Sequence, residues 1–154
     1  MIPKQFIFKL WNFWPPFLGA GIRIAEVHSD FRYARVELKR HFWNQNYVGT
    51  QFGGSMFAMT DAFYMVMLLQ NLGSKYIVWD KSALIRYLKP GKTNLTAEFK
   101  LTNEQIKEIK EAVDREGKID YPLTVNITDS EGVLVAAVDK ILYIRKKQPQ
   151  NKSS

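Results

Sequence analysis

A single carboxylate, Asp61, interrupts an apolar stretch in the middle of the chain, "SMFAMTDAFYMVMLL". Burying an unpaired carboxylate is costly, and burial raises the pKa of such a group. A carboxylate held in an apolar pocket can act as a general base or as a nucleophile. The alternative is that Asp61 points to an opening and meets a hydroxyl or backbone donor. The residue alone supports both interpretations.

Two glycines, Gly53 and Gly54, lie where the apolar stretch begins. Glycine lets a ligand approach the backbone closely, and the first amides of a helix have no partner inside the helix. Such amides can bind an oxyanion, aided by the helix dipole. An ordinary tight turn before a helix is the alternative. Gly54 and Asp61 would be separated by about 10 Å along one helix, so we expect them to share a site only across a dimer interface.

The elements that must position these residues are a helix and a sheet. Residues 55–73 have the length of a five-turn helix, and Gly73 is suited to end it. Residues 56–69 are apolar on nearly every face, which predicts a helix that is buried on all sides. This run is too short to cross a bilayer. A sheet must therefore curl around the helix.

Alternating apolar and polar residues predict the strands of that sheet. Pro90 and Gly91 supply one turn between strands, and residues 130–132 supply another. A second, amphipathic helix over residues 103–117 is capped by Thr102 or Asn103 and lies on a surface. The fold class is therefore α+β. The expected strands are residues 22–28, 31–39, 75–88, 92–102, 119–128 and 132–144.

The two ends of the chain differ from this central part. Residues 3–14 can form a short amphipathic helix before Pro15 and Pro16. We expect its aromatic residues to cap the core, with membrane-surface contact as the alternative; these residues are Trp11, Phe13 and Trp14. We predict one domain over residues 1–145, with an N-terminal helical segment over residues 1–20 and a basic flexible tail over residues 146–154.

Composition excludes several classes of protein. The 154 residues include no cysteine, so disulfides, thiolate metal sites and a cysteine nucleophile are absent, and a cytoplasmic location is the natural interpretation. The chain has 46% hydrophobic residues and two histidines, His28 and His41, so neither disorder nor a multi-histidine metal site is expected. The net charge of +7 is the sole argument for nucleic-acid binding, and we expect none. Neither a signal peptide nor a transmembrane segment is expected.

The stretch "NYVGTQFGGSMFAMTD" resembles the thioesterase signature of the hotdog superfamily, in particular its phenylacetyl-CoA thioesterase-like branch. The matching positions are Asn46, Gly49, Gly53, Gly54 and Asp61. The stretch "VWDKSALIRYLKPGK" and the inserted helix are more similar to an uncharacterised family, a domain of unknown function that is considered thioesterase-like. The resemblance covers roughly residues 20–145. It implies a hotdog fold, with an antiparallel sheet of about six strands wrapped around one long buried helix.

The resemblance also implies roles for individual residues. Gly54 would donate an oxyanion amide, and Asn46 would orient the thioester or a water molecule. Asp61 would be the base or nucleophile and would act from the opposite subunit. Phe52 stands where the superfamily usually has histidine. Phe52, Thr50 and Gly53 would contact the substrate.

Charged residues near the Pro90–Gly91 turn suggest a place for coenzyme A. Arg86, Lys89 and Lys92 can contact its phosphates, and a solvated turn is the alternative. Asp80 lies upstream of Arg86 in the strand predicted over residues 75–88. It can assist Asp61 as a second carboxylate, or it can form an ion pair within the sheet.

The function that these features favour is hydrolysis of an acyl thioester of coenzyme A or of acyl-carrier protein, without a cofactor. A non-catalytic acyl-CoA-binding, lipid-binding or structural hotdog protein is the alternative, which Phe52 favours. A dehydratase is a third possibility, but the surroundings of His41 lack the prolines and glycine of the familiar dehydratase motif. Because an open sheet edge is usually paired or covered, we expect a homodimer or homotetramer.

Overall fold

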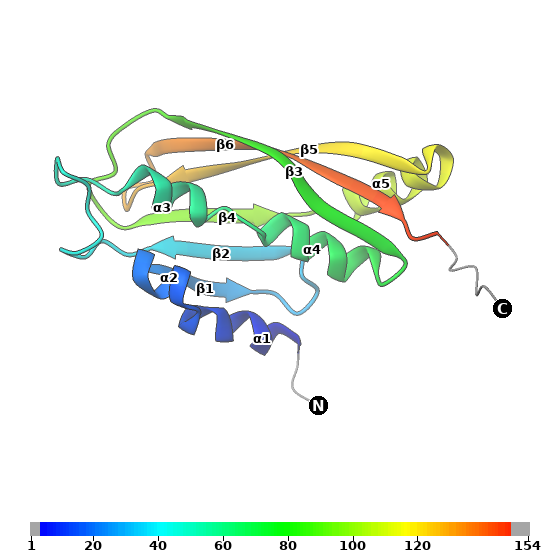
Figure 1. The fold of residues 1–154 in the computed structure, drawn as a ribbon, viewed down its shortest axis with the longest axis horizontal. Coiled ribbons are helices and arrows are strands. Elements are labelled where there is room, and N and C mark those ends of the chain that lie inside the picture. The colour runs from blue at the N-terminus through cyan, green and yellow to red at the C-terminus, as the bar shows by residue number, and fades with distance from the viewer. Residues whose placement is uncertain (1–3, 149–154) are drawn as a thin grey trace.

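The computed structural model describes residues 4–148, and its centre is one antiparallel sheet of six strands in the order β1-β2-β4-β5-β6-β3 (Figure 1). The strands at the two edges are therefore β1 and β3. Each of the six expected strands is present, with bounds that differ by a few residues. The strands are β1 (Ile22–Val27), β2 (Tyr33–Leu38), β3 (Tyr76–Tyr87), β4 (Leu95–Lys100), β5 (Lys118–Thr128) and β6 (Leu134–Lys146).

Helices lie on one face of the sheet and at its ends. Figure 1 shows α3 and α4 following one another across the sheet, with α1 and α2 beside β1 and α5 at the far end. None of the helices within residues 4–148 is both long and apolar enough to cross a membrane. The helices are α1 (Lys4–Leu10), the 3-10 helix η1 (Trp11–Phe13), α2 (Pro15–Ala20), α3 (Gly53–Ala58), α4 (Phe63–Leu72) and α5 (Asn103–Glu116).

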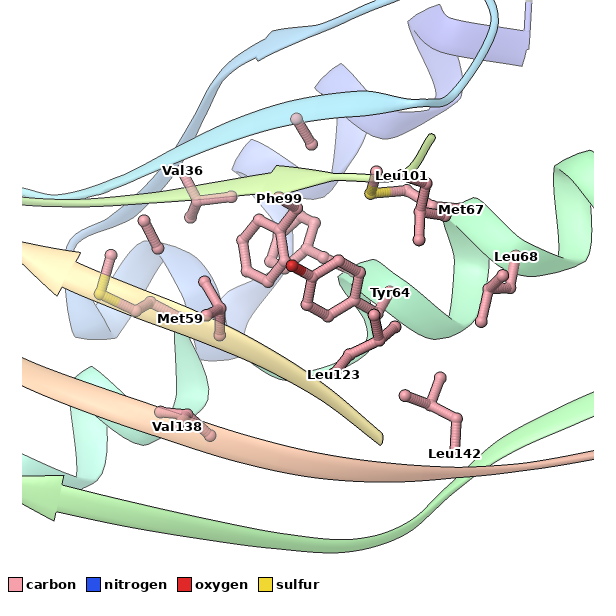
Figure 2. Packing of buried hydrophobic residues seen from close by; sticks show 14 of the residues in the cluster. Val36, Met59, Tyr64, Met67, Leu68, Phe99, Leu101, Leu123, Val138 and Leu142 are labelled. Carbon is pink, nitrogen blue, oxygen red and sulfur yellow. The ribbon is translucent and has the colours of Figure 1, made fainter. Parts of the chain in front are cut away.

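The core lies between α4 and the concave face of the sheet. Burial alternates along β2 and β4, as expected for strands with one face in the core. Figure 2 shows Tyr64 of α4 close to Phe99 of β4 and Leu123 of β5, and the ring centroids of Tyr64 and Phe99 are 5.1 Å apart. The Tyr64 hydroxyl donates a hydrogen bond to the Thr124 carbonyl at 3.1 Å, which satisfies this buried polar group.

The N-terminal segment is fixed to this core by rings other than those expected. The Phe17 ring stacks on Phe63 at 6.0 Å and the Phe8 ring lies 6.4 Å from it, so both contribute to the core. The expectation that three aromatic residues cap the core was wrong for two of them. Trp11 packs against the core, whereas Phe13 and Trp14 are exposed because they lie at the turn before α2.

The single long helix predicted over residues 55–73 is two helices with a break between them. The first ends at Ala58 and the second begins at Phe63. Ala62 has φ 64° and lies in the left-handed region, which L-residues other than glycine rarely adopt. The break changes which side chains face the core: Phe57 is 40% exposed and Met65 is half-buried, so the expectation of a helix buried on all sides was wrong.

Local signals at the ends of the helices were confirmed. Thr102 caps α5 in a capping box with Gln105, and Gly117 ends that helix. Gly73 ends α4. The predicted tail begins too early, because Lys146 is the last residue of β6 and forms an ion pair with Asp114. The remainder of that tail, residues 149–154, lies outside the described part.

Phe63 should be among the most costly residues to truncate. It is fully buried, and its ring contacts those of Phe8, Trp11, Phe17 and Phe99. We expect Phe63→Ala to lower the free energy of unfolding by about 3–5 kcal/mol, as measured by urea denaturation. Phe42→Ala is the matched control, because Phe42 is 86% exposed. Similar losses in both variants would contradict this description of the core.

Candidate functional site

A buried lysine is the charged centre of the site. Lys140 of β6 is 2% exposed and lies on the inward face of the strand, in line with Val138 and Leu142. Its Nζ donates hydrogen bonds to Asp80 Oδ2 at 2.8 Å and to the Thr60 carbonyl at 2.9 Å. Sequence analysis did not single out this residue. The signal was present, since Lys140 occupies an inward position in an otherwise apolar alternation.

Asp80 faces inward because β3 contains a bulge. Asp80 pairs with Leu142 and Ser82 pairs with Ile141, so Lys81 is an extra residue in the strand. Lys81 forms an ion pair with Asp120. Of the two predictions for Asp80, the structure shows the ion pair within the sheet, with Lys140 as the partner. The other carboxylate oxygen of Asp80, Oδ1, is buried and has no hydrogen-bond partner among the described residues.

The hydrogen bond from Lys140 is made at the helix break. Thr60 is fully buried and lies between the two helices. Its carbonyl accepts a hydrogen bond from Lys140 Nζ. Asp61 follows immediately, and its side chain is 74% exposed. Of the two interpretations of Asp61, the structure shows the second, an exposed side chain that meets a backbone donor, because the break turns Thr60 rather than Asp61 toward the core. Asp61 Oδ1 accepts a hydrogen bond from the Ala62 amide at 2.8 Å and lies 4.0 Å from Lys140 Nζ.

Asp61, Asp80 and Lys140 line one hollow of about 310 Å³, which we call the polar hollow. Gly54 lines it too, so Gly54 and Asp61 of the same chain share one wall. The prediction that only a partner chain could bring these two residues to one site assumed a continuous helix. The break at residues 59–62 removes that restriction. The other residues of the lining are Phe57, Ala58, Ser82 and Ala83.

Aromatic rings explain why both positions at the start of α3 are glycine. A Cβ on Gly53 would lie 3.0 Å from the Tyr87 hydroxyl, which donates a hydrogen bond to the Gly53 carbonyl at 2.9 Å. A Cβ on Gly54 would lie 2.6 Å from Cε1 of Phe52, closer than real contacts allow. The Phe52 ring thus covers the glycine backbone on the outside of the molecule.

Asn46 and Thr50 hold the loop before α3. The Asn46 Oδ1 accepts hydrogen bonds from the amides of Val48 at 3.1 Å and Thr50 at 3.0 Å, and its Nδ2 donates to the Thr50 hydroxyl at 2.8 Å. Both residues line a second hollow of about 520 Å³, together with Gly53, Lys89 and Lys92. We call this the basic hollow. Asn46 therefore lines a hollow with Gly53, whereas Asp61 lines one with Gly54.

The three predicted phosphate-binding residues do not gather in one place. Lys89 and Lys92 line the basic hollow, whereas Arg86 forms an ion pair with Asp139 and does not line it. The Arg86 guanidinium, with a hydrogen bond from Thr124, lowers the pKa of Asp139, and Asp139 in turn raises the pKa of Arg86. Within residues 4–148, no group of three or more histidine, aspartate or glutamate side chains is placed to hold a metal ion.

Comparison with known proteins identifies the family. The chain belongs to the family described as a domain of unknown function, DUF4442, whose model matches residues 4–144. A search of curated proteins found no match.

Solved structures show the same fold. A Pseudomonas aeruginosa protein of unknown function, named a probable thioesterase, has a TM-score of 0.80 at 21% identity, over 95% of this chain and 97% of the other. A Haemophilus influenzae thioesterase has a TM-score of 0.68 at 12% identity, over 96% and 94%. A Chlorobaculum tepidum protein of unknown function has a TM-score of 0.73 at 17% identity, over 94% and 97%. The chain thus has the hotdog fold, as the resemblance implied.

The ion pair between Lys140 and Asp80 predicts how substitution of either residue changes the stability of the protein. We expect Lys140→Met to lower the free energy of unfolding by about 3–5 kcal/mol, because it leaves the Asp80 carboxylate buried without a cation. Adding Asp80→Leu should recover most of this loss. Lys81→Met is the control and should cost below about 1 kcal/mol, since its partner Asp120 is exposed. Equal losses for the two lysines in urea denaturation would contradict the buried pair.

The contact between Phe52 and Gly54 predicts that the effect of Gly54→Ala on stability changes sign when the Phe52 ring is removed. Gly54 is in a helix without a positive φ, so alanine should stabilise it by about 0.5–1 kcal/mol where there is room. In the wild type, the Phe52 ring occupies that room. We expect Gly54→Ala to be destabilising by itself and stabilising in a Phe52→Ala background, in a double-mutant cycle of melting temperatures. Additive effects would mean that the ring does not restrict position 54.

Proposed function

We propose that this protein is a thioesterase that hydrolyses an acyl thioester of coenzyme A or of acyl-carrier protein. The observation that supports this most directly is the polar hollow, where the exposed carboxylate of Asp61 and the start of α3 at Gly54 line one wall. Hydrolysis of a thioester needs a base or nucleophile beside a group that stabilises an oxyanion. That both residues line one hollow of a single chain supports these two roles.

In the proposed reaction, Asp61 acts on the carbonyl carbon of the thioester. As a general base, it accepts a proton from a water molecule whose oxygen attacks that carbon. The Gly54 amide donates to the oxygen that becomes negative. When the carbon–sulfur bond breaks, the thiolate takes the proton from Asp61, and a carboxylic acid and a thiol are released. As a nucleophile, Asp61 would attack the carbonyl carbon and form a mixed anhydride as the carbon–sulfur bond breaks and the thiolate leaves. Water would then hydrolyse the anhydride to the carboxylic acid and the Asp61 carboxylate, and the proton released from the water would go to the thiolate.

Lys140 has a positioning role in this proposal. Its hydrogen bond to the Thr60 carbonyl fixes the residue that precedes Asp61, and its charge lies 4.0 Å from Asp61 Oδ1. The strained backbone of Ala62 follows directly. Residues in strained conformations cluster at functional sites, where the surrounding structure holds them. Asp61 is therefore held between two fixed neighbours although its own side chain is exposed.

The basic hollow is the proposed place for the coenzyme. Lys89 and Lys92 can contact phosphate groups there, close to Gly53 and therefore to the start of α3. Thr50 and Asn46 complete the same wall. Because the Asn46 side chain is engaged within its loop, its proposed role changes from orienting the thioester to holding the loop against α3.

The proposed assembly is a homodimer, or a homotetramer made of two such dimers, in the cytoplasm. β3 is an edge strand of 12 residues, and its exposed side chains include Trp79, Leu84 and Tyr87. A long edge strand with apolar residues tends to pair with another chain. Pairing two copies through β3 would place the polar hollows, which include Ser82 and Ala83 of β3, near the interface.

The alternative is an acyl-binding protein without turnover. Phe52 favours it, because the ring lies at Gly54 where a polar side chain of the superfamily would lie. Incubating purified protein with a panel of acyl-CoA and acyl-carrier-protein thioesters separates these functions. Release of free thiol supports the enzyme, whereas a thermal shift without thiol release supports the binding protein.

Asp61 gives the sharpest test of the mechanism. We expect Asp61→Asn to abolish thioester hydrolysis, because the amide can be neither base nor nucleophile. Since Asp61 is largely exposed, the free energy of unfolding should change by less than about 1 kcal/mol. The control is Asp120→Asn, an exposed aspartate outside the polar hollow, which should keep wild-type turnover. An Asp61→Asn variant with wild-type turnover would contradict the assignment of Asp61 as the base or nucleophile.

A further inference from the structure

A third hollow, of about 550 Å³, lies between the N-terminal segment and the helix break. Asp61 is the sole charged residue in its lining, and Ala62 lies beside it. Volumes of this size are typical of sites that bind small molecules. We call it the apolar hollow. Its other lining residues are Leu10, Trp11, Phe13, Trp14, Pro15 and Phe17.

Two residues of the apolar hollow, Phe17 and Trp11, pack in or against the folded core. The Phe17 ring is buried against Phe63, and the Trp11 ring lies 6.4 Å from Phe63. The Trp14 ring lies 5.2 Å from Phe17 and extends this aromatic wall outward. The Asn12 side chain exchanges two hydrogen bonds with the Ile24 backbone, at 2.7 Å and 3.2 Å, and thereby ties this segment to β1. The hollow is therefore preformed.

Asp61 connects this hollow to the proposed chemistry, because it lines both the apolar and the polar hollow. In a thioester, the carbonyl carbon carries the sulfur on one side and the acyl chain on the other. A carbonyl held between Gly54 and Asp61, with its sulfur toward Lys89 and Lys92, would direct its acyl chain past Asp61.

We propose that the apolar hollow binds the acyl chain, and that the substrates are thioesters of medium or long fatty acids rather than acetyl or charged acyl groups. This inference rests on the proposed function and adds the substrate class. Burial of methylene groups against Trp11, Phe13 and Trp14 would supply the binding energy. An acyl group with a negative charge would find no cationic side chain in this lining, where Asp61 is the sole charged residue.

The shape and charge of the hollow favour this occupant over a bilayer or a second copy of the chain. A carboxylate is costly to place in hydrocarbon, so Asp61 in the wall opposes insertion of this surface into a membrane. A flat apolar patch would suit a protein partner, whereas this surface is concave. Both other occupants can be tested directly.

Two leucines of equal exposure form a matched pair for the test. Leu10 and Leu18 are each 60% exposed in short helices of the N-terminal segment, and Leu10 lines the apolar hollow whereas Leu18 does not. We expect Leu10→Ala to raise KM for dodecanoyl-CoA about fivefold to tenfold, and to leave kcat/KM for butanoyl-CoA within twofold. Leu18→Ala should leave both unchanged. Equal effects on the two substrates, or equal effects of the two variants, would overturn the inference.

A binding measurement separates this inference from the proposed function. S-dodecyl-coenzyme A, a thioether that cannot be hydrolysed, should bind the wild type and should bind Leu10→Ala about fivefold to tenfold more weakly in isothermal titration. This result without turnover of any thioester would support the acyl site and reject the enzyme. Turnover of dodecanoyl-CoA with unchanged binding in Leu10→Ala would reject the acyl site and keep the enzyme.

If a bilayer or a second copy of the chain occupies the apolar hollow, Leu10→Ala gives a different result. Suppose that Leu10→Ala reduces cosedimentation with phosphatidylcholine and phosphatidylglycerol vesicles but leaves S-dodecyl-coenzyme A binding unchanged. The hollow would then contact a bilayer, and the inference would be overturned. A shift toward monomer in sedimentation velocity, again with unchanged thioether binding, would show that a second copy covers the hollow and would overturn it as well.

Discussion

The arrangement around the site depends on one buried ion pair. Lys140 lies in the core with its Nζ 2.8 Å from Asp80 and 2.9 Å from the Thr60 carbonyl. A lysine in such a place is tolerated only with partners that replace its water, because burying an unpaired charge is very unfavourable. Three elements must therefore come together at this point: β6 carries the lysine, the bulge of β3 turns Asp80 inward, and the chain between α3 and α4 leaves a carbonyl free. The helix break is thus part of the ion-pair geometry.

The break determines how the functional groups lie. In a continuous helix, Gly54 and Asp61 would be two turns apart, and Asp61 would face the core. With the helix interrupted, Thr60 turns inward, Asp61 turns outward, and Gly54 and Asp61 line one hollow. The cost is the left-handed conformation of Ala62, of order 1–3 kcal/mol. Packing of Phe63 directly after the break, against rings from the N-terminal segment and from β4, contributes stabilisation that offsets this strain.

The three hollows follow one another along the surface and share residues or neighbours. The basic hollow reaches Gly53, the polar hollow begins at Gly54, and Asp61 lines both the polar and the apolar hollow. This order matches the parts of an acyl-coenzyme A molecule, from phosphates through thioester to acyl chain. The family description gives no activity, and the solved structures share at most 21% identity in the three comparisons above, so they show the fold. The proposed function rests on the site geometry and on the resemblance of the signature residues.

The sequence by itself determined the six strands and the capped surface helix, because alternation, capping residues and turn glycines are local signals. The hotdog fold was implied by the resemblance of the signature residues. The sequence also located Gly53, Gly54 and Asp61 as candidate residues from their types. It did not determine the helix break, the exposure of Asp61 or the ion pair between Lys140 and Asp80. These depend on a hydrogen bond between residues 80 positions apart, Lys140 and Thr60, which no local pattern contains. The bulge at Lys81, which changes the residues of β3 that face inward, was likewise decided by the pairing of β3 with β6.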